Sequence, residues 1–229
     1  MVNVKSKKER IIKSSEEISK IKKAIKYTED AIRYALQVFI PGMSEKELAR
    51  KIRKWASKHK LRVGFCIVQG DKNTAGIHKK PTNHKIRKIL LLDVGVVYKG
   101  YFGDITRTYL ICPDKQMKKF YSLLKRSYNR AIKNIKLGAP CWKPEMAARK
   151  LLGKHGKWFP HSLGHGVGLQ VHEHPKVSMK SKYVFKKNMV FTIEPGIYIK
   201  GKFGVRIEDM FLMKNRVQKL STLEIPDYD

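Results

Sequence analysis

Two aspartates flank a predicted β-hairpin near the middle of the 229-residue chain. Asp93 follows an apolar run, Asp104 precedes a second β-rich run, and the turn-prone segment 97–100 separates them. If the chain reverses between Tyr98 and Lys99, we expect the two carboxylates to face each other, with Cβ atoms about 5 Å apart. Like charges at that separation repel, so one carboxylate stays protonated or a cation lies between them. The pair indicates a divalent metal site, with ordinary strand-end aspartates as the alternative.

A second pair of carboxylates repeats this arrangement. Glu194 and Glu208 lie at equal distances from Gly201, and glycine readily adopts the positive φ that tight hairpin turns require. We therefore expect these two glutamates to face each other as well. Since each acid-bearing hairpin follows predicted helices, the sequence indicates two structurally similar halves related by pseudo-symmetry.

Histidines and glycines concentrate between the two hairpins. His161, His165, His172 and His174 fall within fourteen residues, among glycines that permit close approach of the backbone. Carboxylate oxygens together with imidazole nitrogen suit a pair of Mn²⁺, Co²⁺, Fe²⁺ or Zn²⁺ ions about 3.5–4 Å apart. Two such ions can lower the pKa of a shared water and polarise a carbonyl group, so the composition of the site favours a hydrolase.

The chain is strongly basic, with 50 Lys and Arg against 19 Asp and Glu and a net charge of +31. Such a charge suits nucleic acid or a ribosome surface. The lysines are nevertheless spread over the whole chain, and no stacked aromatic platform or recognition motif accompanies them. A solvated basic surface is the favoured interpretation, in which nucleic acid is not required and any RNA association is weak and nonspecific.

The three cysteines have no metal-type spacing, no stretch is apolar enough to span a bilayer, and the first ten residues lack a signal peptide. We therefore expect a cytoplasmic protein.

Residues 1–13 are predicted to form a flexible basic tail and residues 14–229 one catalytic domain. Within that domain the hydrophobic periodicity predicts helices at 14–39, 44–58, 114–136 and 144–152, a strand at 63–69, and a loop at 71–81 that contains His78.

Five residues and their neighbours resemble the metal ligands of the pita-bread metallopeptidases, peptidase family M24. This superfamily includes methionine aminopeptidases, prolidases, aminopeptidases P and creatinase. The resemblance implies an α+β fold in which helices cover a curved antiparallel sheet with pseudo-two-fold halves, and it implies two divalent metal ions. The five corresponding residues are Asp93, Asp104, His165 within Gly-His-Gly-Val-Gly-Leu, Glu194 within Ile-Glu-Pro-Gly-Ile-Tyr, and Glu208 within Val-Arg-Ile-Glu-Asp.

The flanking residues are most similar to the prolidase and aminopeptidase P branch. In particular, Arg206 stands two positions before Glu208, where methionine aminopeptidases usually lack an arginine. Members of this branch ordinarily carry a separate N-terminal domain, whereas this chain is expected to begin at the catalytic domain. For the oligomeric state, the alternatives are a monomer and a homodimer that forms without such an N-terminal domain.

The resemblance also implies roles for individual residues. Glu194 would take the proton from a metal-bridging water, and the resulting hydroxide would attack the peptide carbonyl. His172 would stabilise the oxyanion, and His78 and His161 would contact the leaving side. Arg206 and Tyr198 would contact the metal ligands and hold them in place without binding the metal themselves. For each of these residues, a purely structural hydrogen-bonding role is the alternative.

The predicted activity is hydrolysis of Xaa-Pro bonds at the N-terminus of short peptides. Proline lacks an N–H group and fixes φ, so a peptidase that grips the extended backbone through that donor cannot hold it. The alternatives are a methionine aminopeptidase acting on nascent chains, a creatinase-type hydrolase, and a non-catalytic peptide- or RNA-binding homologue.

Overall fold

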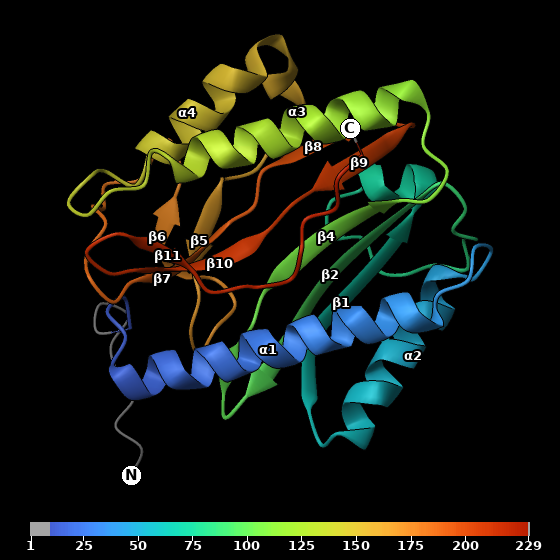
Figure 1. Cartoon of the computed structure of the whole chain (residues 1–229), viewed down its shortest axis with the longest axis horizontal. Coiled ribbons are helices and arrows are strands. Elements are labelled where there is room, and N and C mark those ends of the chain that lie inside the picture. Colours follow the sequence, from blue (N-terminus) through green and yellow to red (C-terminus); the bar gives the residue numbers. More distant parts are fainter. Residues whose placement is uncertain (1–9, 229) are drawn as a thin grey trace.

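The computed structural model describes residues 10–228, so residues 1–9 and 229 fall outside this account. Antiparallel strands form three sheets, with helices α1 and α2 on one side and α3 and α4 on the opposite side (Figure 1). The predicted α+β architecture of helices covering antiparallel sheets is thus confirmed. Within the described range, no helix has the length and apolarity needed to cross a membrane.

Helices α1 (Ser15–Val38) and α2 (Glu45–Lys58) lie where they were predicted, with Ser14 and Ser44 as their N-cap residues. The Ser14 hydroxyl accepts the backbone N–H of Glu17, and the Glu17 carboxylate accepts the N–H of Ser14, which completes a capping box. Ser44 likewise accepts the N–H of Glu47. The apolar faces of both helices join one hydrophobic core with the first sheet.

The first sheet contains β1 (Arg62–Gly70), β2 (Ile89–Tyr98), β3 (Tyr101–Phe102) and β4 (Ile105–Leu110), and β1, β3 and β4 all pair with β2. The short helix η1 (Asp71–Ala75) follows β1, and the loop after it contains His78.

The first hairpin turns one residue later than the sequence predicted. Lys99 and Gly100 form the two-residue turn with φ values of 48° and 86°, and positive φ at both central positions is what a type I′ turn requires. As a result, Asp93 pairs with Thr106 and not with Asp104, so the predicted facing of the two aspartates is wrong. Asp104 instead lies in the break between β3 and β4.

The second half contains α3 (Lys115–Ile132), α4 (Lys143–Leu152) and the short helix η2 (Gly153–Trp158). Its five-stranded sheet has the order β11-β10-β7-β5-β6. The strands of that sheet are β5 (Gly164–Gly166), β6 (Glu173–Val177), β7 (Val190–Ile193), β10 (Asp209–Met213) and β11 (Val217–Lys219).

The remaining two strands, β8 (Gly196–Ile199) and β9 (Phe203–Arg206), form the second predicted hairpin. Gly196 pairs with Arg206, and Gly201 lies at the centre of the turn with a φ of 76°. The predicted reversal at Gly201 is therefore confirmed, and it brings the chain segments that carry Glu194 and Glu208 to the same end of the hairpin.

The prediction of a loose tail is wrong for residues 10–13, while residues 1–9 lie outside the described range. Ile11 is buried in the core beneath α3, and only 2% of Lys13 is exposed. The Lys13 ammonium lies 2.8 Å from a Glu173 carboxylate oxygen and also donates to the carbonyl of Arg10. Because a buried ammonium needs such partners, this ion pair attaches the segment to the strand that follows His172.

A buried arginine connects β4 to β10 and to the segment near the C-terminus. All five N–H donors of Arg107 are used, and two of them bind the Asp209 carboxylate and the Glu208 carbonyl at 2.6 and 2.7 Å. The other three bind the carbonyls of Thr106, Leu223 and Glu224. The guanidinium therefore fixes the backbone at Glu208.

Replacing Arg107 with methionine should lower the free energy of unfolding by about 3–5 kcal/mol. Four carbonyls would each lose a donor, and the buried Asp209 carboxylate would keep only Tyr128 and Lys219 as partners. Urea denaturation measures this change. The exposed Arg126 gives a matched control, and its replacement with methionine should cost less than about 0.5 kcal/mol. Equal losses in the two variants would contradict the assigned role of Arg107.

Candidate metal centre and active site

Three of the predicted metal ligands lie together in the fold. Each of Asp104, His165 and Glu208 offers one ligand atom, and these three atoms all lie within 4.8 Å of one another. They come from the break before β4, from β5, and from the connection between β9 and β10. The site therefore joins strands from both halves of the chain.

The other two predicted ligands line the same cavity, which has a volume of about 210 Å³. Asp93 accepts a 2.6 Å hydrogen bond from Arg206, and Glu194 lies 3.0 Å from Nε2 of His165. All five predicted ligands are thus brought to one cavity, although the first hairpin has a different register from the predicted one.

Burial controls the electrostatics of this cavity. Desolvation raises the pKa values of Asp104 and Glu208 well above the usual range, and the neighbouring carboxylates raise them further. Glu194 behaves differently. Desolvation is the largest single influence and raises its pKa, but the hydrogen bond and charge of His165, together with the charges of His161 and Arg206, lower the pKa of Glu194 to about 2. Although burial opposes protonation, the same bond and the nearby carboxylates raise the pKa of His165 to about 9.

The donor set fits a divalent metal. Four buried carboxylates face a single arginine and one histidine, so without a further cation some of the carboxylates must hold protons. Hard oxygen donors and one imidazole nitrogen are ligands that Mn²⁺, Co²⁺, Fe²⁺ and Zn²⁺ accept. A cation among them would replace the proton on His165, since a metal-binding imidazole nitrogen must be unprotonated.

Arg206 and Tyr198, which were predicted to support the ligands, form a buried hydrogen-bonded chain. Besides binding Asp93, Arg206 donates to the Tyr198 hydroxyl at 2.8 Å, and that hydroxyl lies 3.0 Å from Nε2 of His161. Asp93 is therefore connected to His161 through two intervening side chains. This arrangement fixes the orientation of both residues.

Thr106 belongs to this support, and the sequence analysis missed it. Its hydroxyl donates to a Glu208 carboxylate oxygen at 2.6 Å and accepts from Nε of Arg206 at 3.1 Å. The available signal was the alternation in Asp-Ile-Thr-Arg-Thr, which places Thr106 on the same side of β4 as Thr108. Predicting that Thr106 faces the ligands required the correct register of the first hairpin.

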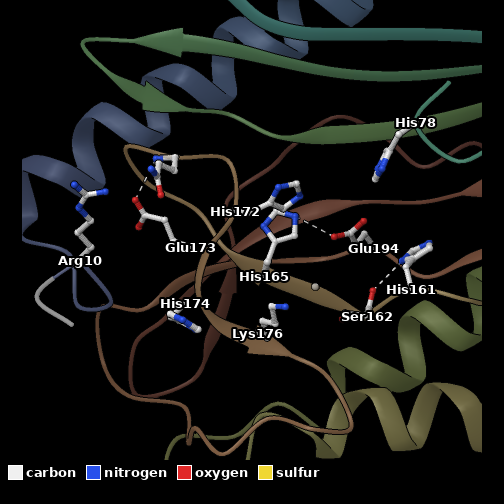
Figure 2. Close-up of a pocket in the computed structure, with 12 residues that line it drawn as sticks. Arg10, His78, His161, Ser162, His165, His172, Glu173, His174, Lys176 and Glu194 are labelled. Atoms are coloured by element: carbon white, nitrogen blue, oxygen red, sulfur yellow. Dashed lines mark hydrogen bonds and ion pairs between the residues drawn. The ribbon is translucent and has the colours of Figure 1, made fainter. Parts of the chain in front are cut away.

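A second cavity of about 520 Å³ adjoins the first, and the two share His78, His165, His172 and Glu194. His161 also lines it, so every histidine predicted to contact substrate faces this space. Figure 2 shows His165 and His172 side by side, with His78 entering from the opposite wall. Cavities of this size hold small ligands in many proteins.

Two of the substrate-side histidines, His161 and His172, have lowered pKa values, which favours the neutral form of their imidazole rings. Burial is the largest cause that lowers the pKa of His161 below its usual value, and burial followed by the charge of His165 lowers the pKa of His172. A neutral imidazole can both donate and accept hydrogen bonds, which suits contact with a peptide carbonyl or amide. The cavity also contains Arg10 and Lys176, which the sequence analysis did not single out.

A helix-covered antiparallel fold that gathers carboxylates and histidines from both halves around one cavity defines a metallopeptidase catalytic domain of the pita-bread type. The model of metallopeptidase family M24 matches residues 19–215, and the chain belongs to that family. The resemblance seen in the sequence is thereby confirmed.

Similar proteins include both dipeptidases and aminopeptidases. The chain is 42% identical to an uncharacterised peptidase of Methanocaldococcus jannaschii, over 100% of this chain and 68% of the relative. It is 35% identical to the Xaa-Pro dipeptidase of Pyrococcus horikoshii, over 94% and 64% of the two chains. The crystal structure of X-Pro aminopeptidase from Thermotoga maritima matches with a TM-score of 0.92 and 35% identity, over 97% and 65%. The chain spans about two thirds of the length of these proteins.

Replacing Thr106 with valine should weaken Mn²⁺ binding about 10–100-fold, because the Glu208 carboxylate loses the hydrogen bond that orients it. Calorimetric titration of the metal-free protein measures this affinity. Thr108 is the matched control, since it is equally buried on β4 and its hydroxyl bonds to the backbone carbonyl and N–H of Arg206. Equal Mn²⁺ affinities for the two valine variants would contradict the role of Thr106.

Proposed function

We propose that the chain is a divalent-metal-dependent exopeptidase that hydrolyses Xaa-Pro bonds at the N-terminus of short peptides. The observation that carries this proposal is the meeting of two cavities, one lined by the five predicted ligands and one lined by the substrate-side histidines. The similarity to the Xaa-Pro dipeptidase and the X-Pro aminopeptidase supports the same specificity.

The five ligands would hold two divalent ions, drawn from Mn²⁺, Co²⁺, Fe²⁺ or Zn²⁺. When bound, such ions act as Lewis acids that polarise a carbonyl group and make water more acidic. The residues proposed to hold the ions are Asp93, Asp104, His165, Glu194 and Glu208.

The remaining residues act on the peptide and its protons. Glu194 lines both cavities, so its carboxylate is placed to accept a proton from a water next to the scissile carbonyl. His172 lies against His165, with ring centroids 4.3 Å apart, and is placed to donate a hydrogen bond to the carbonyl oxygen. His161 and His78 flank the space for the proline side of the bond.

The cavity suits a bond that other peptidases hold poorly. An Xaa-Pro bond offers no N–H to a backbone clamp, so recognition depends on the shape of the ring and on the carbonyl groups. The side chains that line the larger cavity provide N–H donors for those carbonyls. These donors support a mode of recognition in which side chains, rather than a backbone clamp, hold the peptide around its proline ring.

Product release from Met-Pro, Ala-Pro-Ala and Met-Ala-Ser tests the specificity of the protein loaded separately with each of the four metals. We expect cleavage of the two proline peptides and little of Met-Ala-Ser, since only the former present the imide bond. The ratio of Met-Pro to Ala-Pro-Ala turnover distinguishes a dipeptidase from an aminopeptidase. Cleavage of Met-Ala-Ser alone would identify a methionine aminopeptidase and refute the proposal.

Replacing Glu194 with glutamine should retain the fold and much of the bound metal, yet lower kcat by at least about 100-fold, because the amide cannot accept the proton. Metal content after dialysis and the thermal unfolding midpoint separate this effect from loss of structure. Substantial turnover by a metal-loaded Glu194→Gln variant would remove Glu194 from the proposed role.

A further inference from the structure

An open cavity of about 470 Å³ lies apart from the metal centre, where the middle of α1 meets the α2–β1 turn and the β2–β3 turn. It shares no lining residue with the two cavities described above. Its wall contains the cationic side chains Lys60, Arg62 and Lys99, and no acidic residue lines it. Figure 1 shows both turns emerging on the side of the molecule that α1 and α2 cover.

The cations of this wall form no salt bridge within the described part of the protein, although the charge of Lys99 also acts on the Glu16 carboxylate. Among residues 10–228, no carboxylate oxygen lies within 4.0 Å of the charged nitrogens of Lys60, Arg62, Lys99 or the neighbouring Lys23. Lys26 differs, because its ammonium is 2.6 Å from Asp30. Several like charges held around one open cavity create a positive potential that an anionic ligand would relieve.

Two tyrosines stand among these cations. The rings of Tyr27 and Tyr98 are 5.6 Å apart between centroids, although the residues are 71 positions apart in the sequence. The ammonium groups of Lys23 and Lys99 lie 5.4 and 5.8 Å from the centre of the Tyr98 ring. Both tyrosines are partly exposed. The cavity therefore combines aromatic faces with unpaired cations, a combination that the sequence analysis did not detect.

The distribution of charge in the whole molecule favours a polyanionic ligand. Many acidic side chains lie inside the protein, so they do not offset the lysines at the surface. Only three cationic side chains, Lys13, Arg107 and Arg206, are buried among the described residues. The buried acidic side chains are Glu17, Glu29, Glu45, Asp93, Asp104, Glu145, Glu194, Glu208 and Asp209.

We propose that this cavity binds single-stranded nucleic acid, with backbone phosphates on Lys60, Arg62 and Lys99 and a base against Tyr98. Phosphate neutralisation by lysine and arginine releases counterions and supplies sequence-independent affinity. Stacking of unpaired bases on aromatic side chains is the usual complement in proteins that hold single strands. A duplex offers no such bases to Tyr98, because its bases are already stacked and paired.

The test compares two variants: one loses three cationic side chains from the cavity, and the other loses three from a distant surface. In the cavity variant, Lys60→Asn and Lys99→Asn are combined with Arg62→Gln, since asparagine tolerates the positive φ of 56° and 48° at the two lysines. The control variant combines Lys115→Gln, Lys118→Gln and Lys119→Gln on α3, which lies across the molecule from α1 (Figure 1). Both variants lose the same charge, and circular dichroism establishes that each is folded.

Fluorescence anisotropy with a labelled single-stranded RNA of about 12 nucleotides measures binding at several salt concentrations. The cavity variant should bind the RNA at least about tenfold more weakly than the control variant does. The slope of its log affinity against log salt concentration should be smaller in magnitude by about 2. Equal weakening in both variants would overturn the proposal, because it would mean that diffuse surface charge holds the RNA.

Tyr98→Leu tests the stacking contact separately from charge. This variant should weaken single-stranded RNA binding about fivefold or more, while binding of inorganic polyphosphate and of duplex RNA should stay unchanged. Two results would refute the proposal by showing that the cavity is only an anion site. One is unchanged RNA binding by the Tyr98→Leu variant. The other is binding of polyphosphate and duplex RNA that is as tight as binding of the single strand.

Discussion

Four carboxylates held together in an apolar interior are the constraint on which the rest of this structure depends. Asp93 pairs with Arg206 at 2.6 Å and Glu194 with His165 at 3.0 Å, whereas Asp104 lies 3.7 Å from His165. Burial nevertheless raises the pKa values of Asp93, Asp104 and Glu208. Folding alone would not favour such a cluster, because each buried charge costs several kcal/mol unless it is paired. The cluster is a candidate metal site, at which a bound cation would supply the missing positive charge.

Buried guanidinium groups hold this arrangement in place. Arg206 fixes Asp93 and contacts Tyr198 and Thr106, while Arg107 fixes the backbone at Glu208 and the side chain of Asp209. A planar group with several donors can bind several acceptors at fixed angles, which a lysine ammonium does not do. The positions of the ligands therefore depend on β4 and β9 as much as on the strands that carry the ligands themselves.

The sequence predicted the features that depend on local spacing. The turn at Gly201 and the helix that follows Ser14 could be predicted from residue type and order, and the resemblance to the family identified the five predicted ligands that line one cavity. The first hairpin was misplaced by one residue, because Tyr98-Lys99 and Lys99-Gly100 are both plausible turns and only the positive φ of Gly100 decides between them. Thr106, the Lys13–Glu173 pair and the Tyr27–Tyr98 pair depend on contacts across 71 to 160 residues, which periodicity does not contain.

The bonds of Arg107 also set an order of events during protein synthesis. Two of its donors bind the carbonyls of Leu223 and Glu224, which leave the ribosome more than a hundred residues after Arg107 itself. Until that segment is available, the Arg107 guanidinium would lack two of its acceptors. Arg107, which anchors the backbone at Glu208, therefore gains its full set of acceptors only after nearly all of the described residues have been translated.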